Sequence, residues 1–248
     1  MSKKLDESFF QKWSSDMSYV LGYIVADGCI VKDKSRSNSY TVNVTSKDKA
    51  HLYKIRNALS STHKISKKLN GTGHVTYQLQ IRNLSLARDL MKLGILPRKT
   101  HNLDPVQVPS EFFADFARGF FDGDGSVYIY RVNGVNQIKA EYVGVSLPFM
   151  QDFNQKLCSF LEIPIKSIHQ EIREDKMTKY GIVFYISDCE RIADFFYNQG
   201  GSLFLQRKRA IFKRWRLMKR RVFTRREYPS KIGWNLYQKG FKVASLAT

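Results

Sequence analysis

The chain has 248 residues, of which 43% are hydrophobic, and its formal net charge at pH 7 is +19. This apolar content supports one large or two smaller cores and excludes wholesale disorder. The charge indicates a polyanionic partner, and nucleic acid fits better than a membrane, because no apolar run approaches the roughly 20 residues of a membrane span. The N-terminus lacks the apolar region of a signal peptide, so we expect a soluble protein inside the cell, in the cytoplasm or nucleoid, or in an organelle matrix.

Two short apolar helices, each ending in a carboxylate, are predicted around residues 20–27 and 117–124. A helix C-terminus disfavours the carboxylates of Asp27 and Asp124, so the pair calls for a nearby cation. Small residues recur at i and i+4 in both helices, at Gly22, Ala26, Gly119 and Gly123. They would let the two helices pack closely and bring the carboxylates together as a divalent-metal site. The alternative is that both carboxylates are exposed to solvent and have no functional role.

The first half continues with alternating strands and an amphipathic helix. We expect strands at 29–34, 40–46, 63–69 and 74–82, and helices at 48–60 and 85–93. Prolines 97, 105 and 109 then mark a linker.

The second half repeats this order. Strands are expected at 126–132, 138–146, 165–174 and 179–187, and helices at 148–161 and 190–198. The fold class is therefore α+β, with two pseudo-symmetric αββαββα units packed through their first helices, and each antiparallel sheet has a polar face opposite its helices. We place the units at 1–104 and 105–206.

Residues 207–248 form a third, basic segment. A helix over 207–222 carries one apolar stripe and many cations, and 201–248 contain a single acid, Glu227. Non-specific phosphate contact is the favoured interpretation, and a merely solvated charged face is the alternative.

Both repeated motifs resemble the signature of LAGLIDADG homing endonucleases, and the order of strands and helices resembles that family over about residues 15–215. The first copy departs from the family string at Val25, whereas the second keeps Asp122. This position is one of helix packing or capping, so the departure leaves the catalytic interpretation intact.

The resemblance implies a site for Mg²⁺, for which Mn²⁺ should substitute, beside two scissile phosphates. It assigns Asp27 and Asp124 to metal binding and catalysis, with Gly28 and Gly125 beside them. It also implies one basic residue near the scissile phosphate in each half, to stabilise charge or position water, for which Lys99 and Lys208 match best. Arg98 and Arg207 remain alternatives, and the polar residue of a water network would be Ser46 and either Ser146 or Leu147.

The polar strand faces are expected to contact double-stranded DNA in the major groove, over roughly 18 base pairs. In the first half the candidates are Lys32, Lys34, Arg36, Asn38, Asn43, Thr76, Gln78, Gln80 and Arg82. In the second half they are Tyr128, Tyr130, Lys139, Tyr142, Lys166, Lys179 and Tyr185.

The resemblance thus implies a monomeric endonuclease that makes a Mg²⁺-dependent double-strand break at a long, pseudo-palindromic or asymmetric site, without a protein partner. One alternative is an RNA maturase that assists the splicing of its host intron, with that RNA as its partner. The other is a DNA-binding regulator that does not cleave.

Overall fold

The computed structural model describes residues 4–69, 73–97, 103–172, 178–198 and 201–225, with side chains as far as Met218. The chain divides into two compact units, Met1–Phe212 and Lys213–Thr248. The first unit contains both sheets and the beginning of the last helix, α7 (Gln206–Arg225). None of the helices in the described ranges has the length and apolar character needed to cross a membrane.

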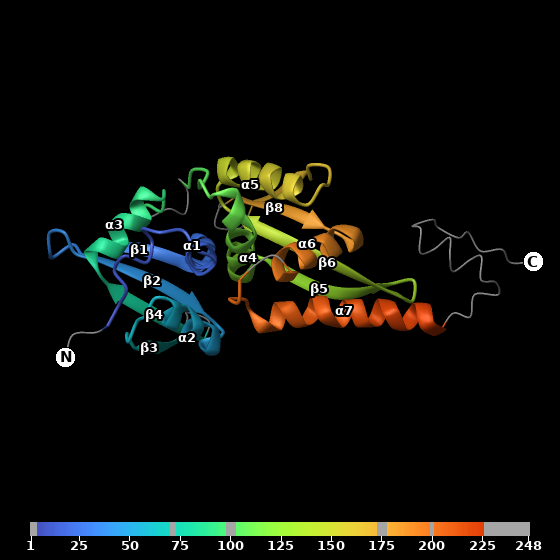
Figure 1. The fold of residues 1–248 in the computed structure, drawn as a ribbon, viewed down its shortest axis with the longest axis horizontal. Helices are drawn as coiled ribbons and strands as arrows, with labels where there is room; N and C mark the ends of the chain where they lie inside the picture. The colour runs from blue at the N-terminus through green and yellow to red at the C-terminus, as the bar shows by residue number, and fades with distance from the viewer. Residues whose placement is uncertain (1–3, 70–72, 98–102, 173–177, 199–200, 226–248) are drawn as a thin grey trace, which may run out of the picture. The chain divides into compact units, whose positions relative to one another are not determined.

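The first half is a four-stranded antiparallel sheet with three helices (Figure 1). Its elements are α1 (Ser15–Asp27), β1 (Gly28–Lys32), β2 (Tyr40–Ser46), α2 (Lys49–Ala58), β3 (Ile65–Leu69), β4 (Val75–Arg82) and α3 (Leu84–Lys92). The strands lie in the order β1-β2-β4-β3. Ser14 is the N-cap of α1, because its side chain accepts a hydrogen bond from the Met17 backbone N–H.

The second half has the same organisation. Its elements are η1 (Ser110–Phe112), α4 (Phe113–Asp124), β5 (Ser126–Val132), β6 (Val135–Gly144), α5 (Leu147–Phe160), β7 (Ile168–Ile172), β8 (Thr178–Phe184) and α6 (Ile186–Asn198). The strand order is β5-β6-β8-β7, which repeats that of the first sheet. The predicted α+β fold of two repeated units is confirmed.

The strand β6 begins three residues earlier than the sequence predicts. Asn133 and Gly134 both adopt positive φ angles, 48° and 78°. Such a two-residue turn matches the twist of the flanking strands, so β5 and β6 pair up to Val132 and Val135 beside the turn.

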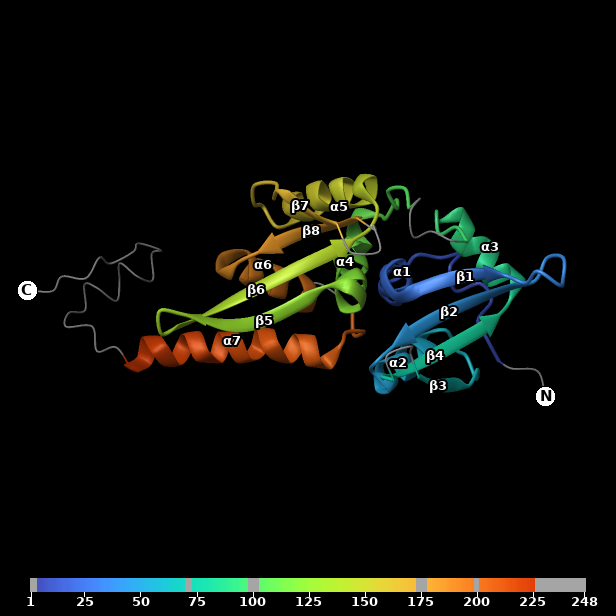
Figure 2. The same ribbon diagram turned by 180° about the vertical axis from the view of Figure 1, so that it is seen from behind.

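Each sheet has one face against its helices and one face turned away. Val42 and Val44 of β2 and Leu79 and Ile81 of β4 are buried on the helix side. The residues between them, such as Asn43 and Gln80, point to the opposite face because side chains alternate along a strand. In Figure 1, α6 lies in front of the second sheet, whereas Figure 2 shows the strands of that sheet from the other side.

Candidate active site at the helix interface

The helices α1 and α4 pack with their backbones in contact. A Cβ atom added at Gly22 would collide with the carbonyl oxygen of Phe116, and one added at Gly119 would collide with that of Tyr19. One turn further along, a Cβ at Gly123 would collide with the Cβ of Ala26. Only small residues permit this approach, so the four positions expected from the sequence lie where the helices meet.

Asp27 and Asp124 end the two helices at the same end of this interface. The ideal Cβ position of Gly123 lies 3.6 Å from the backbone nitrogen of Asp27, which places the last turns side by side. Asp27 is half-buried and Asp124 is exposed. The helix ends that carry the two carboxylates therefore lie side by side where the interface opens to solvent.

Gly28 and Gly125 join each helix directly to its strand. Their φ angles are −104° and −75°, so neither glycine serves as a left-handed helix cap. A Cβ at Gly28 would lie 2.8 Å from the Cα of Ile24, and one at Gly125 would strike the ring of Phe121. The glycines are needed because the chain folds back closely on the preceding helical turn.

Lys208 provides a cation at the end of α4. Its side chain is 2% exposed, and its Nζ donates to the carbonyl oxygens of Phe121, Asp122 (2.9 Å) and Gly125 (2.6 Å). Burial lowers the pKa of Lys208 to about 8, while the negative charges of Asp122, Asp27 and Asp124 act in the opposite direction. The cation that the helix dipole calls for at α4 is thus present within the protein.

Asp122 lies in the core beside this lysine. Its side chain is 1% exposed, and its Oδ2 accepts hydrogen bonds from the Tyr19 hydroxyl (2.6 Å) and the Leu205 backbone N–H (2.7 Å). Burial raises the pKa of Asp122, although both hydrogen bonds and the charge of Lys208 oppose the rise. The packing or capping role expected at this position is performed here by a buried carboxyl group with partners outside its own helix.

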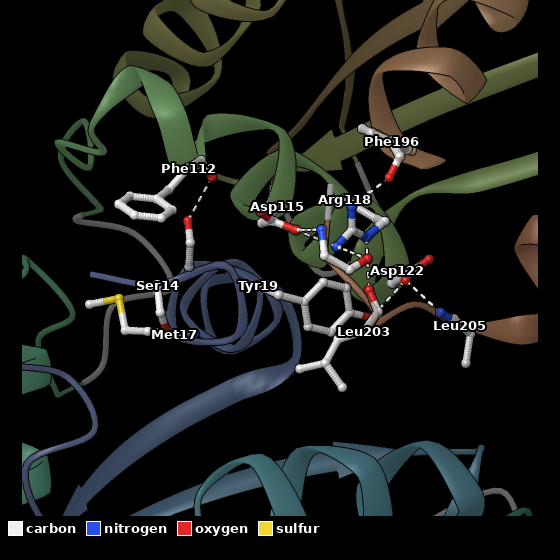
Figure 3. Close-up of polar contacts among 12 residues, drawn as sticks. Ser14, Met17, Tyr19, Phe112, Asp115, Arg118, Asp122, Phe196, Leu203 and Leu205 are labelled. Carbon is white, nitrogen blue, oxygen red and sulfur yellow. Dashed lines mark hydrogen bonds and ion pairs between the residues drawn. The ribbon is translucent and has the colours of Figure 1, made fainter. Parts of the chain in front are cut away.

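Arg118 is fully buried on the same helix (Figure 3). It forms an ion pair with Asp115 and donates to the carbonyl oxygens of Leu203 (2.8 Å), Phe196 and Gly201. Sequence reasoning did not single out Arg118 or Asp115. The sequence did contain a sign of this buried ion pair, because an Asp and an Arg lie three residues apart in a largely apolar helix.

The donor set suits Mg²⁺. No group of three or more His, Cys, Asp or Glu side chains able to hold a metal occurs in the described part of the chain. Mg²⁺ does not need one, because it commonly binds through one or two carboxylates and fills its remaining positions with water and phosphate oxygens. Asp27 and Asp124 supply such a pair, whereas the carbonyl oxygen of Gly125 already accepts the ammonium of Lys208.

A cavity of about 350 Å³ adjoins Asp124. Its lining includes Asp124, Ala26, Cys29 and Lys179. A hollow with a carboxylate and an ammonium group on its walls has the size and the charges to receive a phosphate group and water.

The remaining candidates of the catalytic centre lie in different settings. Lys99 and Arg98 fall outside the described residues. Arg207 is turned toward Asp48, with 2.9 Å between its Nε and the carboxylate. Ser46 accepts a hydrogen bond from the Tyr23 hydroxyl at 3.0 Å, and Ser146 donates to the Leu103 carbonyl at 2.6 Å, so both serine hydroxyls are engaged within the core. Leu147 is the first residue of α5 and carries no polar group.

The face of the first sheet opposite its helices carries a ladder of polar pairs. Across β2 and β4, Asn43 lies opposite Gln80, and the neighbouring pairs on this face are Thr41 with Arg82 and Thr45 with Gln78. Thr76 continues the face. Asn43 and Gln78 are themselves largely buried on this face, and the buried Oδ1 of Asn43 and Oε1 of Gln78 have no hydrogen-bond partner within the described part of the protein.

Four other candidates of the first half lie at one end of this sheet. Lys34, Arg36 and Asn38 are exposed in the connection between β1 and β2. Lys32 ends β1 opposite Tyr40, on the face of Ile30, and is exposed because it lies at the end of the strand.

The second sheet exposes aromatic and charged side chains. Tyr128 lies opposite Lys139, whose Nζ is 5.9 Å from the centre of the tyrosine ring, and Tyr130 donates to Gln137 at 2.9 Å. Glu141, which the sequence did not indicate, lies 3.4 Å from Lys139 and 3.1 Å from His169 on β7. Lys139 and Glu141 lie two residues apart on β6 and so share one face, whereas His169 reaches Glu141 from β7 only through the register of the sheet.

Three predictions for the second sheet need correction. Tyr142 is fully buried and donates to the Ala117 carbonyl at 3.2 Å, because the pairing of β6 turns it toward the helices. Lys166 precedes β7 and forms an ion pair with Asp188 at 2.8 Å. Tyr185 is exposed but follows the last residue of β8. Lys179 lies within β8 as expected.

Comparisons with known proteins agree with this architecture. Residues 14–97 match the sequence model of a LAGLIDADG-like domain, and a search of curated proteins finds no relative. The crystal structure of the LAGLIDADG homing endonuclease I-GzeII in complex with its DNA target is similar, with a TM-score of 0.57 at 13% identity over 92% of this chain and 97% of that chain.

A second similar structure is the meganuclease I-SmaMI bound to uncleaveable DNA. Its TM-score is 0.57 at 15% identity over 94% of this chain and 97% of that chain. The same endonuclease bound to cleaved DNA gives a TM-score of 0.52 at 15% identity over 92% and 95%. At these identities the likeness establishes the fold.

Proposed function

We propose that this chain is a site-specific DNA endonuclease. Its first half contains a LAGLIDADG-like domain, and its two halves share the fold of LAGLIDADG homing endonucleases. It would make a Mg²⁺-dependent double-strand break at a long, pseudo-palindromic or asymmetric site. The observation that carries the proposal is the convergence of Asp27 and Asp124 at the end of a close-packed helix pair, beside the buried ammonium of Lys208.

The chemistry follows from these groups. A divalent ion held by the two carboxylates would stabilise charge on a phosphoryl oxygen and promote ionisation of a water molecule. Lys208 would place positive charge beside the phosphate that is attacked, and Lys99 is proposed for the equivalent role in the first half. The backbones of Gly28 and Gly125, which follow the two carboxylates directly, would lie beside the bound metal. Mn²⁺ has similar ligand preferences and should replace Mg²⁺.

The two sheet faces would recognise the DNA. The Asn43–Gln80 and Thr45–Gln78 pairs offer amide and hydroxyl groups to base edges in a major groove. In the second half, Tyr128, Lys139 and Glu141 present different chemistry, so the two half-sites need not be identical.

The halves would serve one strand each within a single monomer. We propose the division 1–104 and 105–206, with 207–248 adding basic residues that contact phosphate groups without reading sequence.

The test begins with a target selected from a randomised duplex pool by binding without divalent metal. A supercoiled plasmid that carries the target is then incubated with Mg²⁺ and each variant. We expect the wild type to linearise the plasmid, Asp27→Asn and Asp124→Asn to nick it or leave it intact, and Asp152→Asn on α5 to behave as the wild type. Linearisation by both site variants would refute the assignment.

The same preparation separates the alternative functions. A regulator would bind the selected DNA and leave both strands intact with Mg²⁺ present. A maturase would accelerate splicing of its host intron without requiring DNA cleavage.

A further inference from the structure

The segment Gly201–Leu205, which leads into Lys208, is held against α4 by a row of buried ionisable residues. Asp115, Arg118 and Asp122 lie at i, i+3 and i+7 and therefore share one face of the helix. We propose that this row, together with Tyr19 of the first half, positions Lys208 for cleavage of one DNA strand. This inference rests on the proposed function and assigns positioning residues to it.

The row holds the segment at three places (Figure 3). Asp115 accepts a hydrogen bond from the Gly201 N–H at 2.7 Å, Arg118 donates to the Leu203 carbonyl at 2.8 Å, and Asp122 accepts from the Leu205 N–H at 2.7 Å. All three side chains are at most 2% exposed. The backbone is thus fixed at every second residue up to the start of α7.

Lys208 follows Leu205 by one helical turn. The backbone N–H of Lys208 donates to the Leu205 carbonyl at 3.1 Å. The position of Leu205 therefore determines the position of the Lys208 backbone, from which the side chain extends. A shift of Leu205 would carry the ammonium away from the end of α4. Because small displacements of a catalytic group cost large factors in rate, this connection matters for chemistry.

Tyr19 extends the row into the first half. Its hydroxyl gives its hydrogen to Asp122 and lies 3.0 Å from the Nε2 of His51 on α2. The carboxylate that holds Leu205 is therefore itself held by a residue of the first half. In Figure 3 the ring of Tyr19 extends from α1 toward Asp122.

Within the described residues, the link occurs on one side of the pseudo-symmetric interface. The two helices are matched by aligning Gly22 with Gly119. In this alignment α1 has Ser18, Leu21 and Val25 at the positions of the ionisable row, and α4 has Phe116 at the position of Tyr19. A buried ionic group is often replaceable by apolar residues without loss of stability. Stability alone therefore does not account for three such groups on α4, whereas positioning of one particular segment does.

The experiment measures the cutting rate of each strand separately. A duplex of the selected target, labelled on one strand at a time, is cleaved under single-turnover conditions with saturating protein and Mg²⁺. Lys208→Ala identifies the strand that depends on the lysine. We expect Tyr19→Phe, which keeps the ring, to slow this strand about tenfold, and Asp122→Val, which introduces the residue of the matching position, to slow it about 100-fold.

Tyr23→Phe is the matched control. It removes one hydroxyl from an equally buried tyrosine of the same helix, but that hydroxyl bonds to Ser46 within the first half. This variant should leave the rate at the Lys208-dependent strand unchanged. DNA affinity, measured without metal, should be unchanged in all three tyrosine and aspartate variants, so that the effect falls on the rate of chemistry.

The outcomes distinguish the two levels of the proposal. If the wild type cuts neither strand, the proposed function fails. If it cuts both strands, three results would overturn the positioning role alone: no strand depends on Lys208, Tyr19→Phe slows both strands equally, or Tyr23→Phe slows the Lys208-dependent strand as much as Tyr19→Phe does.

Discussion

Acidification should destabilise this protein through His51. The imidazole is 3% exposed, and burial, reinforced by the nearby charge of Lys54, lowers its pKa to about 4. In the unfolded chain a histidine has a pKa of about 6.5. Because the folded state disfavours the charged form, the stabilising contribution is complete above pH 6.5 and is lost as the pH falls from 6.5 toward 4.

The size of the loss follows from the two pKa values. Each pKa unit corresponds to about 1.4 kcal/mol, so the full difference is about 3 kcal/mol, and about 2 kcal/mol of it should be lost between pH 7.5 and pH 5. The assay is urea unfolding at these two pH values for the wild type and His51→Phe. Phenylalanine suits the site because Phe149 occupies the matching position of α5, three residues after the N-cap in both helices.

The decisive quantity is the difference between the two proteins. His51→Phe should lose about 2 kcal/mol less unfolding free energy than the wild type on acidification, whatever its fixed cost from the missing partner of Tyr19. His74→Gln is the control, because it removes an exposed imidazole and so measures how the loss of a histidine that is not buried changes the unfolding free energy. Equal losses in the wild type and His51→Phe would show that His51 does not titrate as its burial requires.

The remaining predictions concern the helix interface, the core and the metal. Gly119→Ala should lower the free energy of unfolding by about 3 kcal/mol, because its Cβ meets the backbone oxygen of Tyr19 and the helices must separate; an unchanged urea midpoint would contradict the contact. Tyr142→Phe should cost about 1 kcal/mol for its lost hydrogen bond and leave DNA affinity unchanged, and a weakened affinity would return Tyr142 to the DNA face. Mg²⁺ at tenfold its Kd should raise the unfolding free energy of the wild type by about 1.4 kcal/mol, and the Asp27→Asn, Asp124→Asn double variant should show no such rise in thermal unfolding.

Sequence patterns predicted the elements and the place where the halves meet, because both depend on local spacing. Gly22 and Gly119 stood out as small residues on apolar helices, and the contacts of their backbones explain that choice. The polar face of the first sheet followed from the strict alternation along β4. In the second sheet the alternation is weaker, and Tyr142 was assigned to the wrong face because only the pairing of β6 with β5 and β8 determines which way it points.

The polar interior could not be predicted in this way. Asp122 bonds to Leu205, 83 residues away, and to Tyr19, 103 residues away in the opposite direction. His169 of β7 meets Glu141 of β6 only through the register of both strands with β8. Such contacts depend on the folded backbone, and a hydrophobicity pattern carries no information about which buried charge meets which donor.

The direct junction of helix and strand has a mechanical consequence. Asp27 ends α1 and Gly28 begins β1, with no residue between them to act as a hinge. The carboxylate and the strand are therefore expected to move together as one rigid element, about the contact between Gly22 and α4. If the first sheet binds a bent duplex as proposed, a tilt of the sheet would be transmitted to the carboxylate, and the curvature of the DNA would be coupled to the spacing of the two acids.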